Sequence, residues 1–249
     1  MSNALHLGQE WLDRLLPDGL PVPSSTIISG PGGSGKPLIG AIILAAWLRA
    51  GGNALVFQLN ADRRSAERLL ALYNLNPAEF RNRIIFIDLD PQIDTVDQIQ
   101  PDMIRANILK PELLRKSIET GQHLLNSSRE NVMLYGSALN ILFFSHTWGD
   151  KIFAEWERLL FHEKEYTSTF SVSTSAFREK IEQLEILADN LMYTRMGKSM
   201  AMRFQIVRVK GARFEPIDVT VPLTEETLTS LKTETDRFRK RIIPMVSKI

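Results

Sequence analysis

The chain has 249 residues, enough for one large α/β domain with a buried core or for two small domains. Hydrophobic residues make up 44% and charged residues 24%, which excludes a disordered or fibrous chain. The formal net charge of +1 lacks the basic excess of most nucleic-acid-binding proteins, so DNA or RNA is disfavoured as a partner, although a local basic face stays open. The absence of cysteine excludes disulfides, thiolate metal sites and a cysteine nucleophile.

The N-terminal stretch and the longest apolar run of the sequence predict neither export nor membrane insertion. The N-terminal stretch MSNALHLGQEWLDRLL has no basic start followed by a continuous apolar core, so we expect no secretory peptide. The longest apolar run, residues 37–48, is shorter than the ~20 residues that cross a bilayer. We therefore expect a cytoplasmic protein with no membrane partner.

Residues 26–59 predict a β-strand, a glycine-rich loop, a helix and a second strand. The strands are expected at residues 26–29 and 54–59, where β-branched and apolar residues run together. The helix at residues 38–50 is apolar almost all round, which indicates burial against a sheet. This βαβ unit is the context in which a glycine-rich loop binds phosphate.

The rest of the chain alternates between predicted helices and strands. We expect helices at residues 62–75, 111–125, 150–162 and 177–188, and strands at residues 83–89, 131–137 and 166–175. Residues 90–103 are acidic and proline-punctuated, which predicts an irregular surface excursion. Strand-like runs at residues 190–196, 201–211 and 214–221 indicate antiparallel strands added to a parallel sheet, and a charged helical tail follows from residue 224. The predicted fold class is α/β, with a mostly parallel central sheet flanked by helices and antiparallel strands at the C-terminal side.

The stretch SGPGGSGKPLIG, residues 29–40, matches the phosphate-binding pattern G-x-x-x-x-G-K-[ST] except at its last position. Unpaired N–H groups at a helix N-terminus bind phosphate, and Lys36 would add a positive charge. Pro37 lacks both the hydroxyl that ligates Mg²⁺ and a backbone N–H. The alternative is a tight strand-to-helix connection kept for packing. The predicted phosphate-binding residues are Gly30, Pro31, Gly32, Gly33, Ser34, Gly35, Lys36, Pro37 and Leu38.

Two segments, one just before the glycine-rich loop and one in the last third of the chain, resemble RecA-superfamily ATPases of the KaiC and RadA-like type. The approach LDRLLPDGLP before the loop, and the stretch LADNLMYTRM followed by AMRFQIVRVKGARF, are similar to conserved segments of that family in the same order. The resemblance covers about residues 5–223 and implies one RecA-like P-loop domain at residues 1–223, followed by the tail at residues 224–249. It also implies ATP or ADP as the ligand, and assembly with copies of itself or with related RecA-like subunits.

Two positions depart from what this resemblance implies. The strand that should end in a magnesium-holding aspartate reads Tyr135-Gly136-Ser137, with Gly136 in the aspartate's place; if residues 141–146 are the strand instead, Phe144 takes that place. After the second strand, where relatives carry water-orienting glutamates, the chain has Asn60 and Ala61. Asp62 comes one residue later, and its alternative role is to stabilise a helix N-terminus.

Two further segments have both a functional and a structural interpretation. Arg208 and Lys210 resemble basic residues that reach the γ-phosphate of a neighbouring subunit; alternatively, together with Arg203 and Gln205, they form the solvent face of an edge strand. The serine- and threonine-rich run at residues 171–175 presents hydroxyls at the carboxyl end of a strand, where α/β sheets bind ligands, or is simply a strand.

Loss of the hydroxyl at position 37, the aspartate at position 136 and the glutamate near position 60 together predicts little or no ATP hydrolysis. We predict a regulatory or scaffolding module that binds a nucleotide or has lost it, with magnesium present only if the nucleotide carries it. One alternative is a slow ATPase activated by ring assembly, with Arg208 and Lys210 acting in trans. The other is an accessory protein of DNA recombination, which would need a basic strip such as the cluster at residues 237–241.

Overall fold

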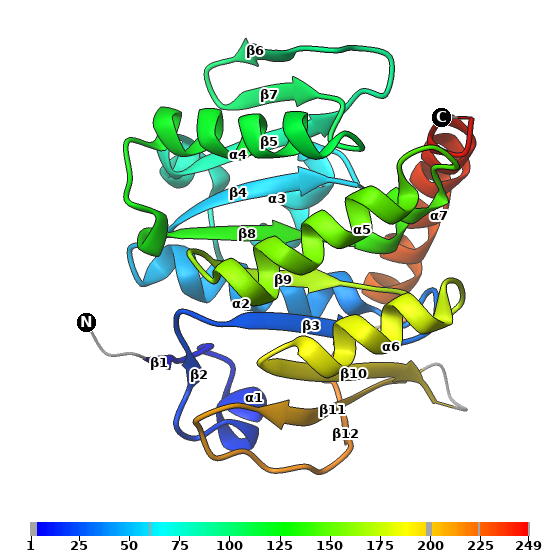
Figure 1. Cartoon of the computed structure of the whole chain (residues 1–249). Helices are drawn as coiled ribbons and strands as arrows, with labels where there is room; N and C mark the ends of the chain where they lie inside the picture. The colour runs from blue at the N-terminus through cyan, green and yellow to red at the C-terminus, as the bar shows by residue number, and fades with distance from the viewer. Residues whose placement is uncertain (1–3, 60, 198–200, 224, 249) are drawn as a thin grey trace.

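The computed structural model describes residues 4–59, 61–197, 201–223 and 225–248, and ten of its strands form one sheet (Figure 1). In spatial order these are β12 (Val219–Thr220), β11 (Met202–Val209), β10 (Asn190–Met196), β3 (Ser25–Ser29), β9 (Thr167–Ser171), β8 (Val132–Gly136), β4 (Asn53–Gln58), β5 (Ile84–Leu89), β7 (Met103–Ala106) and β6 (Val96–Gln100). The seven strands from β10 to β7 are parallel, and antiparallel strands are added at both edges. This arrangement confirms the predicted fold class.

Helices cover both faces of the sheet (Figure 1). One face carries α4 (Pro111–Leu125), α5 (Gly149–Glu157) and α6 (Arg178–Leu187), and the opposite face carries α2 (Lys36–Arg49) and α3 (Arg63–Ala71). The shorter helical turns are η1 (Pro77–Arg83), η2 (Arg129–Asn131), η3 (Leu139–Phe144) and the π-helix η4 (Arg158–Glu163). A small hairpin of β1 (Ala4–Leu5) and β2 (Leu20–Pro21), with α1 (Glu10–Leu15) between its strands, packs beside α2. Among the described residues, no helix is both long and apolar enough to cross a membrane.

Two buried apolar layers lie on either side of the sheet. One joins the sheet to α4, α5 and α6, and the other joins it to α1, α2 and α3. Helix α2 is buried along almost its entire length, which explains why its sequence is apolar all round. The last helix, α7 (Glu225–Val246), crosses the edge at which the parallel strands end (Figure 1).

Three sequence-based expectations were wrong. Residues 90–103 contain β6 and the start of β7 rather than irregular chain, and β6 is exposed along nearly all its residues, so it lacks the apolar alternation that predicts a strand. The alternative strand at residues 141–146 is instead largely the helical turn η3, so β8 with Gly136 at its end is the strand in question. The strand expected at residues 214–221 is shortened to the two residues of β12.

Candidate functional site

The loop between β3 and α2 needs glycine at positions 30 and 35 for reasons of space. Both residues have positive φ values, +146° and +81°. A Cβ atom on Gly30 would lie 2.1 Å from the carbonyl oxygen of Thr194 on β10, and one on Gly35 would lie 2.5 Å from Sδ of Met202 on β11. Since a larger residue fits at neither position, packing against β10 and β11 fixes the path of the loop.

Lys36 is buried inside this loop. Its side chain is only 6% exposed, and Nζ donates hydrogen bonds to the carbonyl oxygens of Gly30 at 2.8 Å and Pro31 at 2.5 Å, and to Oγ of Ser34 at 3.2 Å. Burial, with a smaller contribution from the charge of Arg239, lowers the pKa of Lys36 from 10.5 to about 7. The lysine therefore holds the loop together while its charge lacks a negative partner among the described residues.

The backbone of the loop presents unused donors. Gly32 N donates to Oγ of Ser175 at 3.2 Å, and Leu38 N donates to the carbonyl oxygen of Gly35 at 3.0 Å. Within the described part of the chain, no hydrogen bond uses the N–H groups of residues 33–36. Pro37 occupies the second position of α2, where proline is tolerated but contributes no N–H. Four adjacent N–H groups at the start of a long helix can donate hydrogen bonds to the oxygens of a phosphate.

The residues expected to hold a magnesium ion do not fit one. Pro37 has no hydroxyl, and Gly136, at the end of β8, has no side chain. A Cβ atom on Gly136 would lie 2.8 Å from Cε1 of Phe170 and 3.3 Å from Cβ of Phe57, so aromatic packing fills the space of an aspartate. The described residues also contain no cluster of three or more histidine, aspartate or glutamate side chains that could hold a metal ion.

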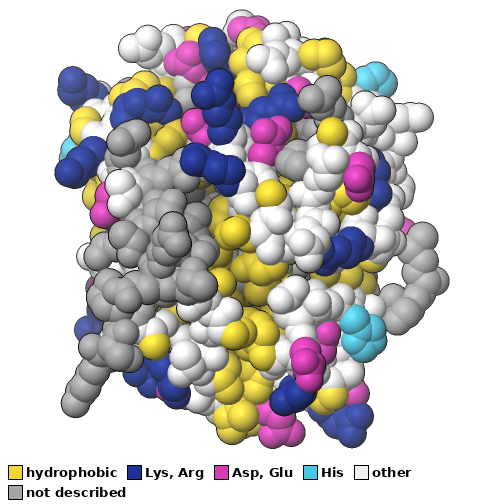
Figure 2. Space-filling model, turned by 180° about the vertical axis from the view of Figure 1, so that it is seen from behind, with side chains coloured by type: hydrophobic (Ala, Val, Ile, Leu, Met, Phe, Trp, Pro, Cys, Tyr) yellow, Lys and Arg dark blue, Asp and Glu magenta, His cyan; other side chains and the backbone are white. Residues whose placement is uncertain are grey.

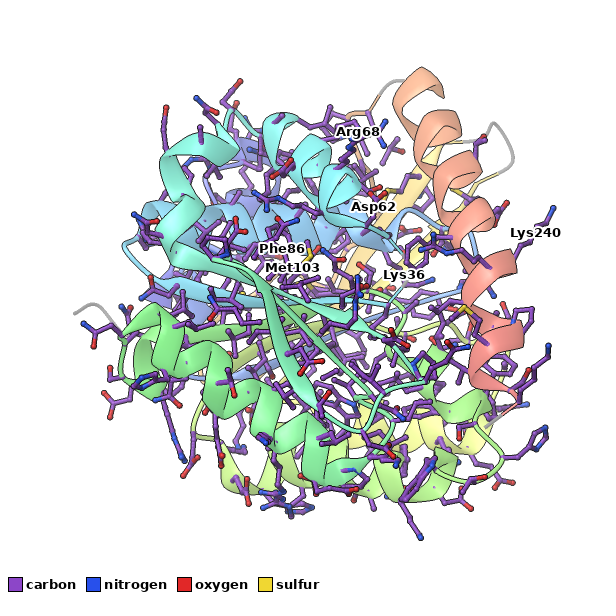
Figure 3. The ribbon with its side chains drawn as sticks, turned by 90° about the horizontal axis from the view of Figure 1, so that it is seen from above. Lys36, Asp62, Arg68, Phe86, Met103 and Lys240 are labelled. Carbon is purple, nitrogen blue, oxygen red and sulfur yellow. The ribbon has the colours of Figure 1, made fainter. Side chains whose placement is uncertain are left out.

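Asp62 caps a helix. Its Oδ1 accepts hydrogen bonds from Ser65 N at 3.0 Å and Ser65 Oγ at 2.7 Å, at the N-terminus of α3 (Figure 3). Partial burial would raise the pKa of this carboxyl, but the bonds from Ser65 and two nearby arginines lower it. These contacts match the helix-stabilising interpretation of Asp62. The other candidate after β4, Asn60, lies outside the described residues.

Arg208 and Lys210 lie far from the loop of their own chain. Strand β11 runs antiparallel to β10. Arg208, near the end of β11, therefore lies toward the amino ends of the parallel strands, whereas Gly30 follows the carboxyl end of β3. The guanidinium of Arg208 donates to the carbonyl oxygens of Glu185 and Ala188 and so caps the C-terminus of α6. Lys210 is mostly exposed, with Nζ 3.7 Å from a carboxylate oxygen of Asp189.

Two contacts of the loop come from the serine-rich run after β9, for which the sequence offered this as one of two interpretations, and from α7, whose contact with the loop the sequence did not predict. Ser175, in the serine-rich run after β9, binds Gly32 N, so that run does present a hydroxyl to the loop. Arg239 of α7 lies against the loop: a Cβ atom on Gly32 would be 3.4 Å from Nη1 of Arg239. From the sequence, Arg239 was identified only as a member of a basic cluster, because the pattern of a charged helix does not predict which of its basic side chains points toward the body of the protein.

The sheet order, with a glycine loop between β3 and the buried helix α2, defines a RecA-like P-loop fold. A KaiC-like protein from the hyperthermophilic archaeon Pyrococcus horikoshii has a similar structure, with a TM-score of 0.64 that covers 88% of this chain and 94% of that protein. The two sequences are 15% identical, so the likeness concerns the fold. No protein-family model and no curated protein sequence matches the chain.

Proposed function

We propose that this chain binds the phosphates of ATP or ADP at the loop of residues 30–38 and serves as a regulatory or scaffolding module with little or no hydrolysis. The four unused N–H groups of residues 33–36, beside the buried charge of Lys36, are the observation that supports binding. Pro37, and Gly136 packed under Phe170, support the lack of hydrolysis, because phosphoryl transfer depends on a positioned metal ion. Assembly with copies of itself or with RecA-like subunits, and a cytoplasmic location, stay predictions.

The two alternative functions receive less support from the described contacts. Arg208 is committed to capping α6, which opposes its use as a residue that reaches a neighbouring subunit's nucleotide. On the face shown in Figure 2, many Lys and Arg side chains gather in the upper part of the view, but acidic side chains lie among them, which opposes a continuous basic groove for DNA on that face.

Calorimetric titration of the full chain with ATP and ADP, with and without Mg²⁺, tests the proposal. We expect wild type to bind and Lys36→Ala to bind at least about tenfold more weakly, because the variant loses both a positive charge beside the bound phosphate and the hydrogen bonds by which Nζ of Lys36 holds the loop. Lys240→Ala is the matched control, since Lys240 is an exposed lysine whose side chain points away from the loop (Figure 3). Equal affinity of Lys36→Ala and wild type would refute binding at this loop, and steady phosphate release that Lys36→Ala abolishes would refute the lack of hydrolysis.

A further inference from the structure

Helix α7 places one arginine at the phosphate-binding loop. Figure 1 shows α7 across the carboxyl ends of the parallel strands, and Figure 3 shows Lys36 beside this helix. Nη1 of Arg239 would lie 3.4 Å from a Cβ atom on Gly32, so the guanidinium covers the outer side of the loop. Lys240, the next residue, is exposed and points away from Lys36 (Figure 3).

The position of Arg239 is set by the buried face of its helix. Ile242 and Val246 are buried in the same apolar layer as η3, α5 and α6. Arg239 precedes them by three and seven residues, and residues at this spacing lie on one face of a helix. Arg239 is therefore directed toward the body of the protein, whereas the neighbouring charges of Lys240 and Arg241 are exposed.

Arg239 and Lys36 form a pair of positive charges without a counter-charge. In the described parts of the chain, neither side chain has an ion pair with a carboxylate, and Arg239 has no hydrogen-bond partner. Like charges held together repel, and the charge of Arg239 contributes to the lowered pKa of Lys36. An anion that binds between Arg239, Lys36 and the N–H groups of residues 33–36 would relieve this repulsion, and guanidinium groups match the geometry of phosphate.

We propose that Arg239 binds the phosphates of the nucleotide in the same chain. Its guanidinium would supply the positive charge that a magnesium ion supplies in P-loop sites that hold one, so that the loop binds metal-free nucleotide. This inference rests on the proposed function. The space that Phe170 and Phe57 fill at Gly136, and the missing hydroxyl at Pro37, leave a magnesium ion without its usual protein ligands. The fixed charge of Arg239, by contrast, is already beside the loop without any metal ion.

Titrations of the full chain with ATP, in EDTA and in Mg²⁺, test this role of Arg239. Wild type should bind ATP in EDTA within about threefold of its affinity in Mg²⁺. Arg239→Ala should bind at least about tenfold more weakly in EDTA, because it loses a charge-assisted contact with phosphate. Arg239→Lys should recover part of that loss, and Lys240→Ala should behave as wild type. Denaturation curves establish that each variant is folded.

The outcomes separate this inference from the proposed function. If wild type binds ATP only in Mg²⁺, or Arg239→Ala binds as tightly as wild type in EDTA, the role of Arg239 is refuted while binding at the loop stands. Tighter binding by Arg239→Ala also refutes it, because α7 would then obstruct the loop. If wild type binds ATP in neither buffer, the proposed function fails, and the inference fails with it.

Discussion

A lysine without a counter-charge, such as Lys36, makes the folded protein sensitive to pH. Its ammonium is satisfied by the carbonyl oxygens of Gly30 and Pro31, but carbonyl dipoles offset only part of the cost of burying a charge. The lowered pKa of about 7 expresses that cost. A bound phosphate would remove the cost, and so binding of nucleotide should stabilise the folded state.

The stability of the ligand-free protein should therefore rise with pH above neutrality. Between the folded pKa of about 7 and the ordinary value of 10.5, the unfolded chain binds more protons than the folded protein, so the free energy of unfolding increases with pH. Below this window both states carry the charge, and the cost of burial is fully present. The increase has an upper bound of about 1.4 kcal/mol per pH unit.

Urea denaturation between about pH 7 and pH 9.5 measures this effect, with the ordinary pKa of lysine as the upper limit of the window. Lys36→Met is the control, because it keeps the length of the side chain and removes the titrating group. We expect the free energy of unfolding of wild type to rise more steeply with pH than that of Lys36→Met. Parallel curves for the two proteins would contradict the buried, charged lysine.

The packing of β8 on its neighbours β4 and β9 explains why an acidic residue is absent from the end of β8. Gly136 lies under the fully buried ring of Phe170, which also contacts the rings of Phe57 and Trp156. A ring held on several sides cannot move away from an added atom without moving its neighbours. An aspartate at position 136 would therefore compete with Phe170 for the same space in this sheet.

Gly136→Ala should reduce the free energy of unfolding by about 1–3 kcal/mol, because its Cβ atom overpacks the core. Phe170→Leu removes the aromatic atom that the new Cβ would meet, at its own cost of a smaller side chain. The double variant should lose less free energy of unfolding than the sum of the losses in the two single variants. Denaturation of wild type, the two single variants and the double variant measures this difference. If Gly136→Ala is as stable as wild type, the space at Gly136 is larger than these contacts indicate.

At the level of elements, the sequence predicted those whose apolar pattern is continuous. The buried strands β3, β4 and β5 and the helix α2 begin and end within two residues of their expected bounds. Each of these elements is a continuous run of apolar residues, and such a run indicates burial and shows where the element lies. The exposed hairpin strand β6 was missed because it buries almost nothing. The glycine loop was predicted as a phosphate site from its spacing, but Arg239 was not, because its place depends on how α7 docks far from the loop in sequence.

For the whole molecule, the question is whether the proposed phosphate site is complete within one chain. Helix α7 covers the loop from the same chain, whereas Arg208 and Lys210 lie at the opposite edge of the sheet and could serve only a neighbouring copy. A site completed by α7 has an affinity that does not depend on protein concentration. A site shared between chains gains affinity as the chains assemble.

Arg208→Ala distinguishes these two arrangements. The variant loses the cap on the carbonyl groups of Glu185 and Ala188, so we expect it to lose about 1–2 kcal/mol of stability. Its affinity for ATP should equal that of wild type at every protein concentration, because Arg208 does not reach the loop of its own chain. Lys210→Ala is the control, since its exposed side chain makes one loose ion pair and its loss should change stability by less than about 0.5 kcal/mol. An ATP affinity or a rate of phosphate release that rises with protein concentration in wild type, and falls in both variants, would instead assign these residues to a site between chains.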